Sequence, residues 1–118
     1  MDGCRILVAD DDDSLRETLV EILRFEGYEV EAARDGLQAV LSATRSRPSV
    51  VLLDMRMPIL DGWQVARQLA ALGVNVPIVV MSAQVDAEAA ARGLRAAGWL
   101  EKPFKLEELL PTIGRLCA

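Results

Sequence analysis

Short apolar runs alternate with amphipathic segments along the chain. Three runs are rich in β-branched residues and too short for a helix, which predicts buried strands at residues 6–9, 50–53 and 78–81. Residues 29–32 alternate polar and apolar side chains, as an edge strand does, and residues 99–101 form a brief further candidate. The pattern therefore predicts five strands.

The segments between these strands have the periodicity of helices. The clearest one ends before Gly27, a typical helix C-cap, and places four apolar side chains on one face: Leu15, Leu19, Ile22 and Leu23. Similar patterns predict helices over residues 37–46, 63–72, 86–97 and 106–116. Strand and helix thus alternate five times.

This alternation predicts an α/β fold with a parallel sheet covered by helices on both faces, because parallel strands need right-handed helical crossovers. Five strands suit the flavodoxin-like doubly wound order 2-1-3-4-5. In that order, ligands bind at the carboxyl ends of the first and third strands. We expect the functional residues there.

The length of 118 residues allows one domain with its own core and leaves no room for a second domain of ordinary size. The apolar stretches are too short to span a bilayer, and residues 1–5 do not begin a secretory signal, so we expect a soluble protein of the cytoplasm. Cys4 and Cys117 lie at opposite ends of the sequence and form no disulfide framework or metal-ligand spacing. We expect both to be free thiols.

The charge of the chain excludes several functions. A formal net charge of -5 argues against the basic surface that duplex DNA needs, so we expect no direct nucleic-acid partner. The sequence contains no histidine, which excludes a Ser-His-Asp group, a His-ligated zinc site and phosphohistidine chemistry within the chain. Any phosphoryl group must therefore come from a partner.

Acidic residues follow two of the predicted buried strands. The first strand leads into four consecutive aspartates at residues 10–13, and the third leads directly into Asp54. Asp12 and Asp13 are explained as solvated loop residues or helix N-terminal charges, with Asp13 or Ser14 as the N-cap. Asp54 is not explained in this way, because a carboxylate that directly follows four apolar residues has poor access to water.

Adjacent strand ends should bring these carboxylates together. Two carboxylates 4 Å apart repel by roughly 4 kcal/mol at an effective dielectric constant near 20, so the cluster requires protonation or a cation. All-oxygen ligation suits Mg²⁺, with Mn²⁺ as an alternative. Asp54 could then attack phosphorus as a nucleophile. Ser82 ends the predicted fourth strand, and Lys102 follows the fifth. The hydroxyl of the serine and the ammonium group of the lysine both suit a phosphoryl ligand.

Together these motifs resemble a response-regulator receiver domain of two-component signalling over essentially the whole chain, residues 1–118, with no effector domain. The motifs are Asp10-Asp11 after an apolar strand, Asp54-Met55-Arg56-Met57-Pro58 with Asp61-Gly62, Ser82-Ala83, and Lys102-Pro103-Phe104. The resemblance implies a signalling domain rather than a conventional enzyme. It also implies a sensor histidine kinase or a histidine phosphotransfer protein as the phosphoryl donor.

The resemblance also implies roles for single residues. Asp54 would be the phosphoacceptor, Asp10 and Asp11 would form the acidic pocket, and the main-chain carbonyl of Arg56 would join Asp11 and Asp54 on the metal. Phosphorylation would draw the Ser82 hydroxyl inward and let the ring of Trp99 follow. The resulting output surface would be the fourth helix, the fifth strand and the fifth helix.

Some positions depart from the family pattern. The connection before Trp99 is about two residues shorter than expected. This could shorten the fourth helix or change the position of the Trp99 side chain. Lys105 stands where an N-capping residue is usual, and Pro111 falls inside the fifth helix, so this helix could start late or bend. Arg56 and Gln84 flank the site at positions that the resemblance associates with phosphate lifetime.

Three alternatives remain open from the sequence. Asp10, Asp12 and Ser14 form a D-x-D-x-S series like that of haloacid-dehalogenase-type phosphatases, although such enzymes need further acidic ligands after the lysine. A flavodoxin-like FMN module is disfavoured because an acidic crevice repels the cofactor phosphate. A receiver-shaped interaction domain that is never phosphorylated is the third alternative.

Overall fold

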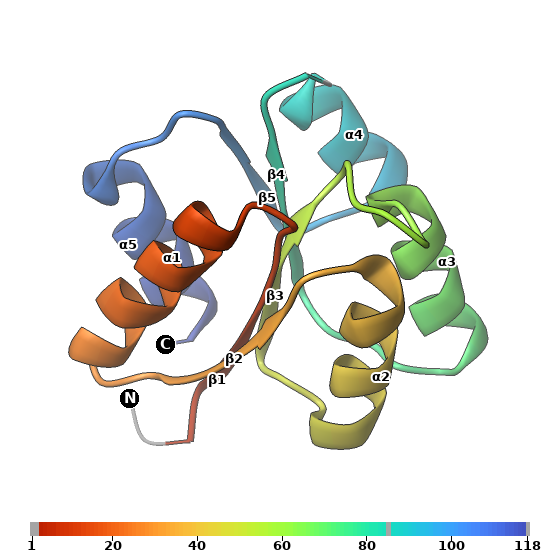
Figure 1. The fold of residues 1–118 in the computed structure, drawn as a ribbon, viewed down its shortest axis with the longest axis horizontal. Helices are drawn as coiled ribbons and strands as arrows, with labels where there is room; N and C mark the ends of the chain where they lie inside the picture. Colours follow the sequence, from red (N-terminus) through yellow and green to blue (C-terminus); the bar gives the residue numbers. More distant parts are fainter. Residues whose placement is uncertain (1–2, 85, 118) are drawn as a thin grey trace.

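A parallel five-stranded sheet lies between two layers of helices in the computed structural model, which describes residues 3–84 and 86–117 (Figure 1). Its order, β2-β1-β3-β4-β5, confirms the predicted flavodoxin-like topology. The strands are β1 (Arg5–Ala9), β2 (Glu29–Ala33), β3 (Val50–Asp54), β4 (Ile78–Ser82) and β5 (Gly98–Glu101). The helices are α1 (Asp13–Phe25), α2 (Gly36–Ser46), α3 (Gly62–Ala71), α4 (Ala87–Leu94) and α5 (Leu106–Leu116).

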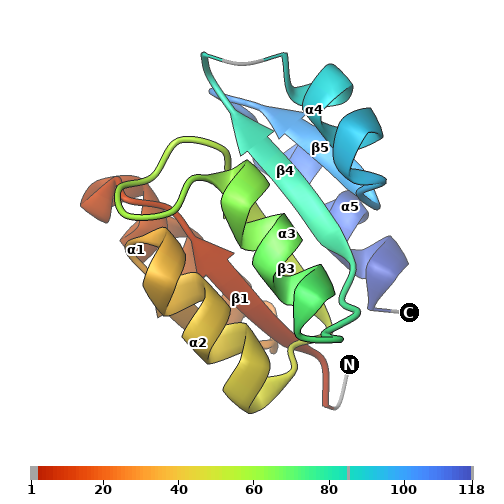
Figure 2. The ribbon, with the colours of Figure 1, turned by 90° about the vertical axis from the view of Figure 1, so that its right-hand side faces the viewer.

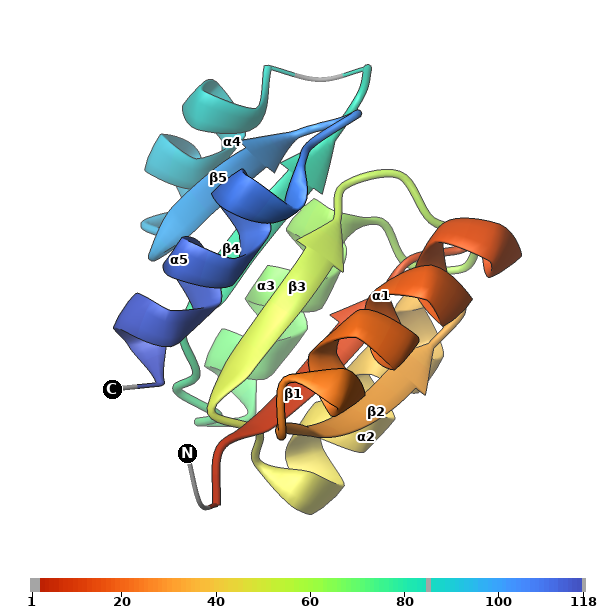
Figure 3. The same ribbon diagram turned by 90° about the vertical axis from the view of Figure 1, so that its left-hand side faces the viewer.

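Both faces of the sheet are covered. Helices α2, α3 and α4 lie on one face (Figure 2), and α1 and α5 lie on the other (Figure 3). Successive strand residues point to opposite faces, so each central strand contributes to two apolar cores. Ile6 and Val8 pack with residues of α1 and α5, whereas Leu7 and Ala9 pack with residues of α2 and α3. Strand β3 is buried at every position, which explains its uninterrupted apolar sequence up to Asp54.

Aspartate side chains cap four of the helices. Asp12 caps α1, because its side chain accepts a hydrogen bond from the Leu15 amide at 3.1 Å. The prediction of Asp13 or Ser14 as the cap was therefore wrong, and the helix already begins at Asp13. The other capping residues are Asp35, Asp61 and Asp86. These caps satisfy amide groups that the first turn of a helix leaves unpaired.

Helix α4 is shorter than predicted. It ends at Leu94 rather than at residue 97, because Arg95 adopts a left-handed φ of 56°. The Ala97 amide already donates to the Ile78 carbonyl at 2.7 Å, so the chain joins the sheet within three residues. The short connection before Trp99 thus shortens α4, which was one of the two outcomes expected from the sequence.

Helix α5 begins at Leu106 as predicted, so the non-capping Lys105 does not delay it. The Lys105 amide instead donates to the Glu108 side chain at 3.2 Å. Pro111 lies inside the helix and does not end it. The expectation of a late start was therefore wrong.

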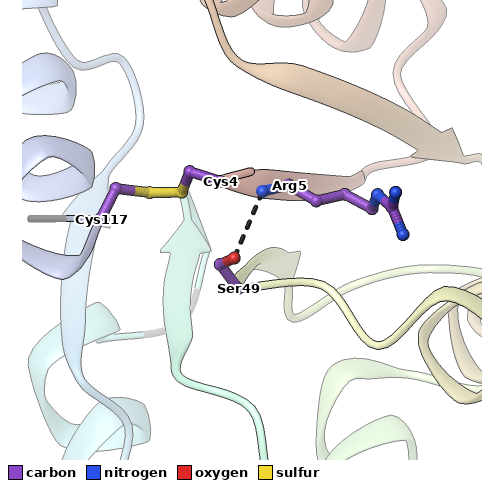
Figure 4. The surroundings of a disulfide bond; sticks show 4 residues. All are labelled: Cys4, Arg5, Ser49 and Cys117. Carbon is purple, nitrogen blue, oxygen red and sulfur yellow. Dashed lines mark hydrogen bonds between the residues drawn. A yellow bond between two sulfur atoms is a disulfide. The ribbon is translucent and has the colours of Figure 1, made fainter. Parts of the chain in front are cut away.

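Cys4 and Cys117 form a disulfide across 113 residues of sequence, so the prediction of free thiols was wrong (Figure 4). Their Cα atoms lie 5.9 Å apart, within the range that a disulfide spans. The topology of the fold brings the two cysteines together. Helix α5 covers the same face of the sheet as α1, and its last turn lies beside the start of β1. The spacing of two cysteines in a sequence does not reveal such proximity.

Candidate functional site

The predicted site residues gather at one edge of the sheet because all five strands are parallel. Asp10 follows β1, Asp54 ends β3, Ser82 ends β4 and Lys102 follows β5. The Lys102 amide donates to the Ser82 carbonyl at 2.8 Å, which extends the pairing of the last two strands past their ends. A pocket of about 350 Å³ opens here, lined by Asp10, Asp11, Asp12, Asp54, Arg56, Ser82, Ala83, Gln84 and Lys102.

Three carboxylates converge in this pocket. Asp10 is 0% exposed and Asp54 is 6% exposed, whereas Asp11 is open to solvent. Each offers one oxygen that lies within 4.8 Å of the corresponding oxygens of the other two. At such separations the negative charges repel, so the cluster favours a divalent cation or a retained proton. The predicted acidic group is therefore present as a spatial cluster.

Lys102 compensates part of this charge. Its Nζ atom lies 2.7 Å from Asp10 Oδ2 and 3.5 Å from Asp54 Oδ1. The other oxygen of Asp10 accepts a hydrogen bond from the Asp12 amide at 2.9 Å. Asp10 thus has the pairing that a fully buried charge requires. The sequence predicted that Lys102 would pair with phosphate or with Asp54, whereas Asp10 is its nearer partner.

Asp54 is the carboxyl group with the most perturbed environment. Its pKa is raised from 3.8 to about 6, mainly because burial disfavours the charged form and secondly because of the negative charge of Asp10. Lys102 and the Arg56 amide act in the opposite direction, and Asp11 adds a smaller increase. The raised pKa means that the surroundings disfavour the ionised form of Asp54, which a bound cation would stabilise.

The loop after β3 is folded tightly against Asp54. The Arg56 amide donates to Asp54 Oδ1 at 3.3 Å, so its backbone lies beside the carboxylate. Gly62 returns the chain to the strand end by donating to the Met55 carbonyl at 3.1 Å. A Cβ atom on Gly62 would lie only 2.9 Å from the Asp54 carbonyl oxygen and 2.8 Å from Met55 Cα. Glycine at this position therefore permits the close approach.

Comparison of the sequence with known protein families identifies the family of this chain. The model of the response regulator receiver domain matches residues 6–114. The chain belongs to the response-regulator receiver family. Receiver domains of this family are phosphorylated on an aspartate in two-component signalling, and they bind Mg²⁺ in an acidic pocket.

Curated relatives of this receiver domain include response regulators called MprA. The one from Mycobacterium leprae is 46% identical over 114 residues, and the one from Mycobacterium sp. (strain KMS) is 47% identical over 114 residues. In both cases the match covers 95% of this chain and 50% of the relative. The chain thus spans about half the length of the curated relatives it matches.

Solved structures of similar receivers have the same fold. The chemotaxis protein CheY4 of Vibrio cholerae superposes with a TM-score of 0.86 at 32% identity, covering 96% of this chain and 98% of that one. A Francisella response-regulator receiver domain gives a TM-score of 0.87 at 28% identity, covering 97% of this chain and 96% of that one. The family assignment removes the phosphatase and flavin alternatives.

One residue that contacts the acidic loop beside the receiver pocket was not predicted from the sequence. Arg16, on the first turn of α1, donates to the main-chain carbonyl of Asp10 at 2.9 Å and to Asp13 Oδ1 at 2.6 Å. Its side chain is only 14% exposed. The i,i+3 spacing of Asp13 and Arg16 in the sequence indicates an ion pair on a helix. The hydrogen bond to the Asp10 carbonyl is evident only from the folded chain.

The two predicted switch residues of the receiver lie in different environments. Ser82 is buried and lines the pocket. Trp99 is 43% exposed on β5 and lies outside the pocket lining. Trp99 pairs in register with Val80, two residues before Ser82 on the neighbouring strand. The fold therefore brings together Asp10, Asp11, Asp54, Ser82 and Lys102 and leaves Trp99 on the surface nearby.

Proposed function

We propose that Asp54 of this receiver domain accepts a phosphoryl group from a sensor histidine kinase or a histidine phosphotransfer protein in a Mg²⁺-dependent reaction. The observation that carries the proposal is the position of Asp54 at the buried end of β3, within 4.8 Å of Asp10 and Asp11 and 3.5 Å from Lys102. The absence of histidine from the chain means that the phosphohistidine belongs to the donor. This domain therefore receives the phosphoryl group from a donor and does not form a phosphohistidine itself.

The donor set fits a hard divalent cation. Asp10, Asp11, Asp54 and the main-chain carbonyl of Arg56 supply only oxygen atoms, as Mg²⁺ prefers, and Mn²⁺ suits the same set. The bound cation would offset negative charge on the phosphoryl group during transfer. The convergence of three carboxylates with one lysine supports this assignment, because their charge is only partly compensated.

The chemical step uses the carboxylate of Asp54. One of its oxygens bonds to phosphorus as the N–P bond of the donor phosphohistidine breaks, and the imidazole nitrogen retains that electron pair. Lys102 pairs with a phosphoryl oxygen by a short movement from Asp10. The Ser82 hydroxyl donates to a second phosphoryl oxygen. Asp54 and its neighbours act once per phosphoryl group, and hydrolysis of the acyl phosphate resets the domain.

The output is a change of surface on α4, β5 and α5. When Ser82 moves toward the phosphoryl group it leaves space on the β5 side, which the ring of Trp99 can fill. The exposed position of Trp99 supports this as the unphosphorylated arrangement. A downstream protein or effector domain would read the new surface.

We propose the cytoplasm as the place of action, where histidine kinases present their phosphohistidine. Within residues 3–84 and 86–117, every helix falls short of the length and apolar character needed to cross a bilayer. A fluorescent fusion tests the location directly, since a signal at the cell envelope or outside the cell would contradict it.

The decisive experiment is phosphorylation with acetyl phosphate in the presence of Mg²⁺, followed by intact mass measurement. We expect an adduct of about 80 Da that is stable in acid and labile in base. The adduct should be absent from Asp54→Asn and from samples treated with a chelator. An unmodified wild-type protein with a folded circular dichroism spectrum would support the interaction domain that is never phosphorylated.

A further inference from the structure

The Cys4–Cys117 disulfide lies outside the phosphorylation site. It joins the residue before β1 to the residue after α5, at the amino-terminal end of β1, whereas the acidic pocket lies at the carboxyl ends of the strands (Figure 4). Both cysteines are buried, at 6% and 8% exposure, in the apolar cluster under α1 and α5. The phosphoryl chemistry proposed above uses neither residue.

The disulfide is a principal anchor of α5. Leu109 and Ile113 are the buried residues of this helix, Leu110 and Leu116 pack partly exposed against the same cluster, and Cys117 continues the buried stripe by one turn. Pro111 removes one amide donor from the helix, and Gly114 lowers its intrinsic stability. Arg115 adds one hydrogen bond to the Ala97 carbonyl at 3.3 Å. A helix with so few buried residues depends strongly on a covalent bond at its last turn.

The proposed cytoplasmic location bears on the state of this bond. Low-molecular-weight thiols keep most cysteines reduced in a cytoplasm, so a disulfide there is usually transient or regulatory. The bond lies at the opposite end of β1 from Asp10 and Asp54. These considerations favour a disulfide that opens and closes over a purely structural one.

We propose that Cys4 and Cys117 form a thiol–disulfide exchange site whose substrates are low-molecular-weight disulfides and thiols, and whose oxidised state fixes the end of α5 to the start of β1. This inference goes beyond phosphorylation, and it rests on the cytoplasmic location proposed above. The proposed site would respond to the redox state at the amino-terminal end of the sheet. Its oxidation would make α5 more ordered.

The exchange proceeds through a mixed disulfide. The thiolate of one cysteine attacks a sulfur of the small disulfide and releases one small thiolate. The thiolate of the other cysteine then attacks the protein sulfur of the mixed disulfide, which closes Cys4–Cys117 and releases the second small thiolate. The two protons of the protein thiols pass to the released thiolates. The protein is thus oxidised by two electrons, and the small disulfide is reduced to two thiols.

The first experiment equilibrates the wild-type protein with mixtures of oxidised and reduced glutathione, followed by acid quenching, alkylation and intact mass measurement. We expect a single reversible transition between a doubly alkylated and an unalkylated protein. The Cys4→Ser variant should retain glutathione on Cys117 under oxidising mixtures, because the second attack is lost. Two thiols that stay alkylatable in every mixture, or a disulfide that never opens in reduced glutathione under native conditions, would overturn the proposal.

The second experiment measures the order of α5. Hydrogen exchange of the α5 amides should quicken at least several-fold on reduction, while the amides of β3 stay protected. The melting temperature should fall on the order of 10 °C, because the disulfide closes nearly the whole chain. Cys4→Ser/Cys117→Ser is the matched control and should show no response to glutathione. Equal α5 exchange in both redox states of the wild type would contradict the coupling even if the disulfide forms.

Discussion

Lys102 lies nearer to Asp10 than to Asp54, with its Nζ atom 2.7 Å from Asp10 Oδ2 and 3.5 Å from Asp54 Oδ1. The lysine therefore compensates the fully buried carboxylate and leaves Asp54, the proposed phosphoacceptor, only partly compensated. Asp54 keeps a raised pKa, and a bound cation would supply the positive charge that its ionised form lacks. Lys102 thus compensates one aspartate of the pair more than the other.

Lys102→Met should destabilise the metal-free protein by about 3 kcal/mol at neutral pH, because it leaves Asp10 buried without its counter-charge. Adding Asp10→Asn to this variant should recover most of the loss, whereas adding Asp54→Asn should recover less. Urea denaturation in the presence of a chelator measures these differences as a double-mutant cycle. An equal recovery from both second substitutions would contradict the preference of Lys102 for Asp10.

The stability of the metal-free protein should depend on the ionisation of Asp54. Its pKa is about 6 in the folded chain and 3.8 as the unperturbed value, so between these values the folded state binds more protons than the unfolded state. Stability should therefore fall as the pH rises from about 4 to about 6, by up to about 3 kcal/mol. Urea denaturation with a chelator at several pH values measures this change.

Asp54→Asn is the control for that titration. The variant has no carboxyl group to ionise, so its stability relative to the wild type should increase over the same pH range. A difference between the two proteins that is independent of pH would contradict the raised pKa. Saturating Mg²⁺ should remove most of the destabilisation at pH 7, because it binds the ionised carboxylate.

Arg16→Ala should weaken Mg²⁺ affinity about 10-fold, because Arg16 holds the carbonyl of Asp10 and so positions the acidic loop. Arg16→Lys should recover only part of this loss, since a single ammonium group cannot reach both Asp10 and Asp13 as a guanidinium does. Fluorescence of Trp63, which lines a neighbouring hollow with Asp11 and Arg56, can report the titration in a Trp99→Phe background.

Arg92→Ala is a matched control for Arg16, because it removes another arginine–carboxylate pair, 2.6 Å from Glu88, on the exposed side of α4. We expect its Mg²⁺ affinity to equal that of the parent. A 10-fold loss in both variants would indicate a general charge effect and not the positioning of Asp10.

Gly62→Ala should destabilise the protein by about 2 kcal/mol and slow phosphorylation, because the added Cβ would lie 2.6 Å from Met55 Sδ and displace the loop beside Asp54. Gly114→Ala provides the opposite case, since nothing lies within 4 Å of its added Cβ inside α5. It should stabilise by about 0.5–1 kcal/mol. Thermal denaturation and the rate of acetyl phosphate labelling distinguish the two, and a neutral Gly62→Ala would contradict the tight loop.

Trp99 should become less exposed on phosphorylation. In a Trp63→Phe background its emission should shift to shorter wavelength and its quenching by iodide should decrease after acetyl phosphate and Mg²⁺ are added. The same background with Asp54→Asn should show no change. An unaltered emission in a protein that carries the phosphoryl group would remove Trp99 from the proposed switch.

The sequence alone determined the fold class and the main site. Local patterns located five buried or edge strands and the helices between them, because the periodicity of apolar residues reflects which faces are buried. The parallel order then followed from the crossovers, and it placed Asp10, Asp54, Ser82 and Lys102 at one edge. These features depend on short-range pattern and on general topology, both of which a sequence records.

The tertiary structure alone decided which of these groups contact one another. The nearer partner of Lys102, the bond from Arg16 to the Asp10 carbonyl and the Cys4–Cys117 disulfide each join atoms through space. The end of α4 at Leu94 also depended on the hydrogen bond from the Ala97 amide to the Ile78 carbonyl of β4, which draws the chain into the sheet and overrides the local helical periodicity. Angles and distances between packed elements set such contacts to within an ångström, and residue spacing along a chain does not contain that information.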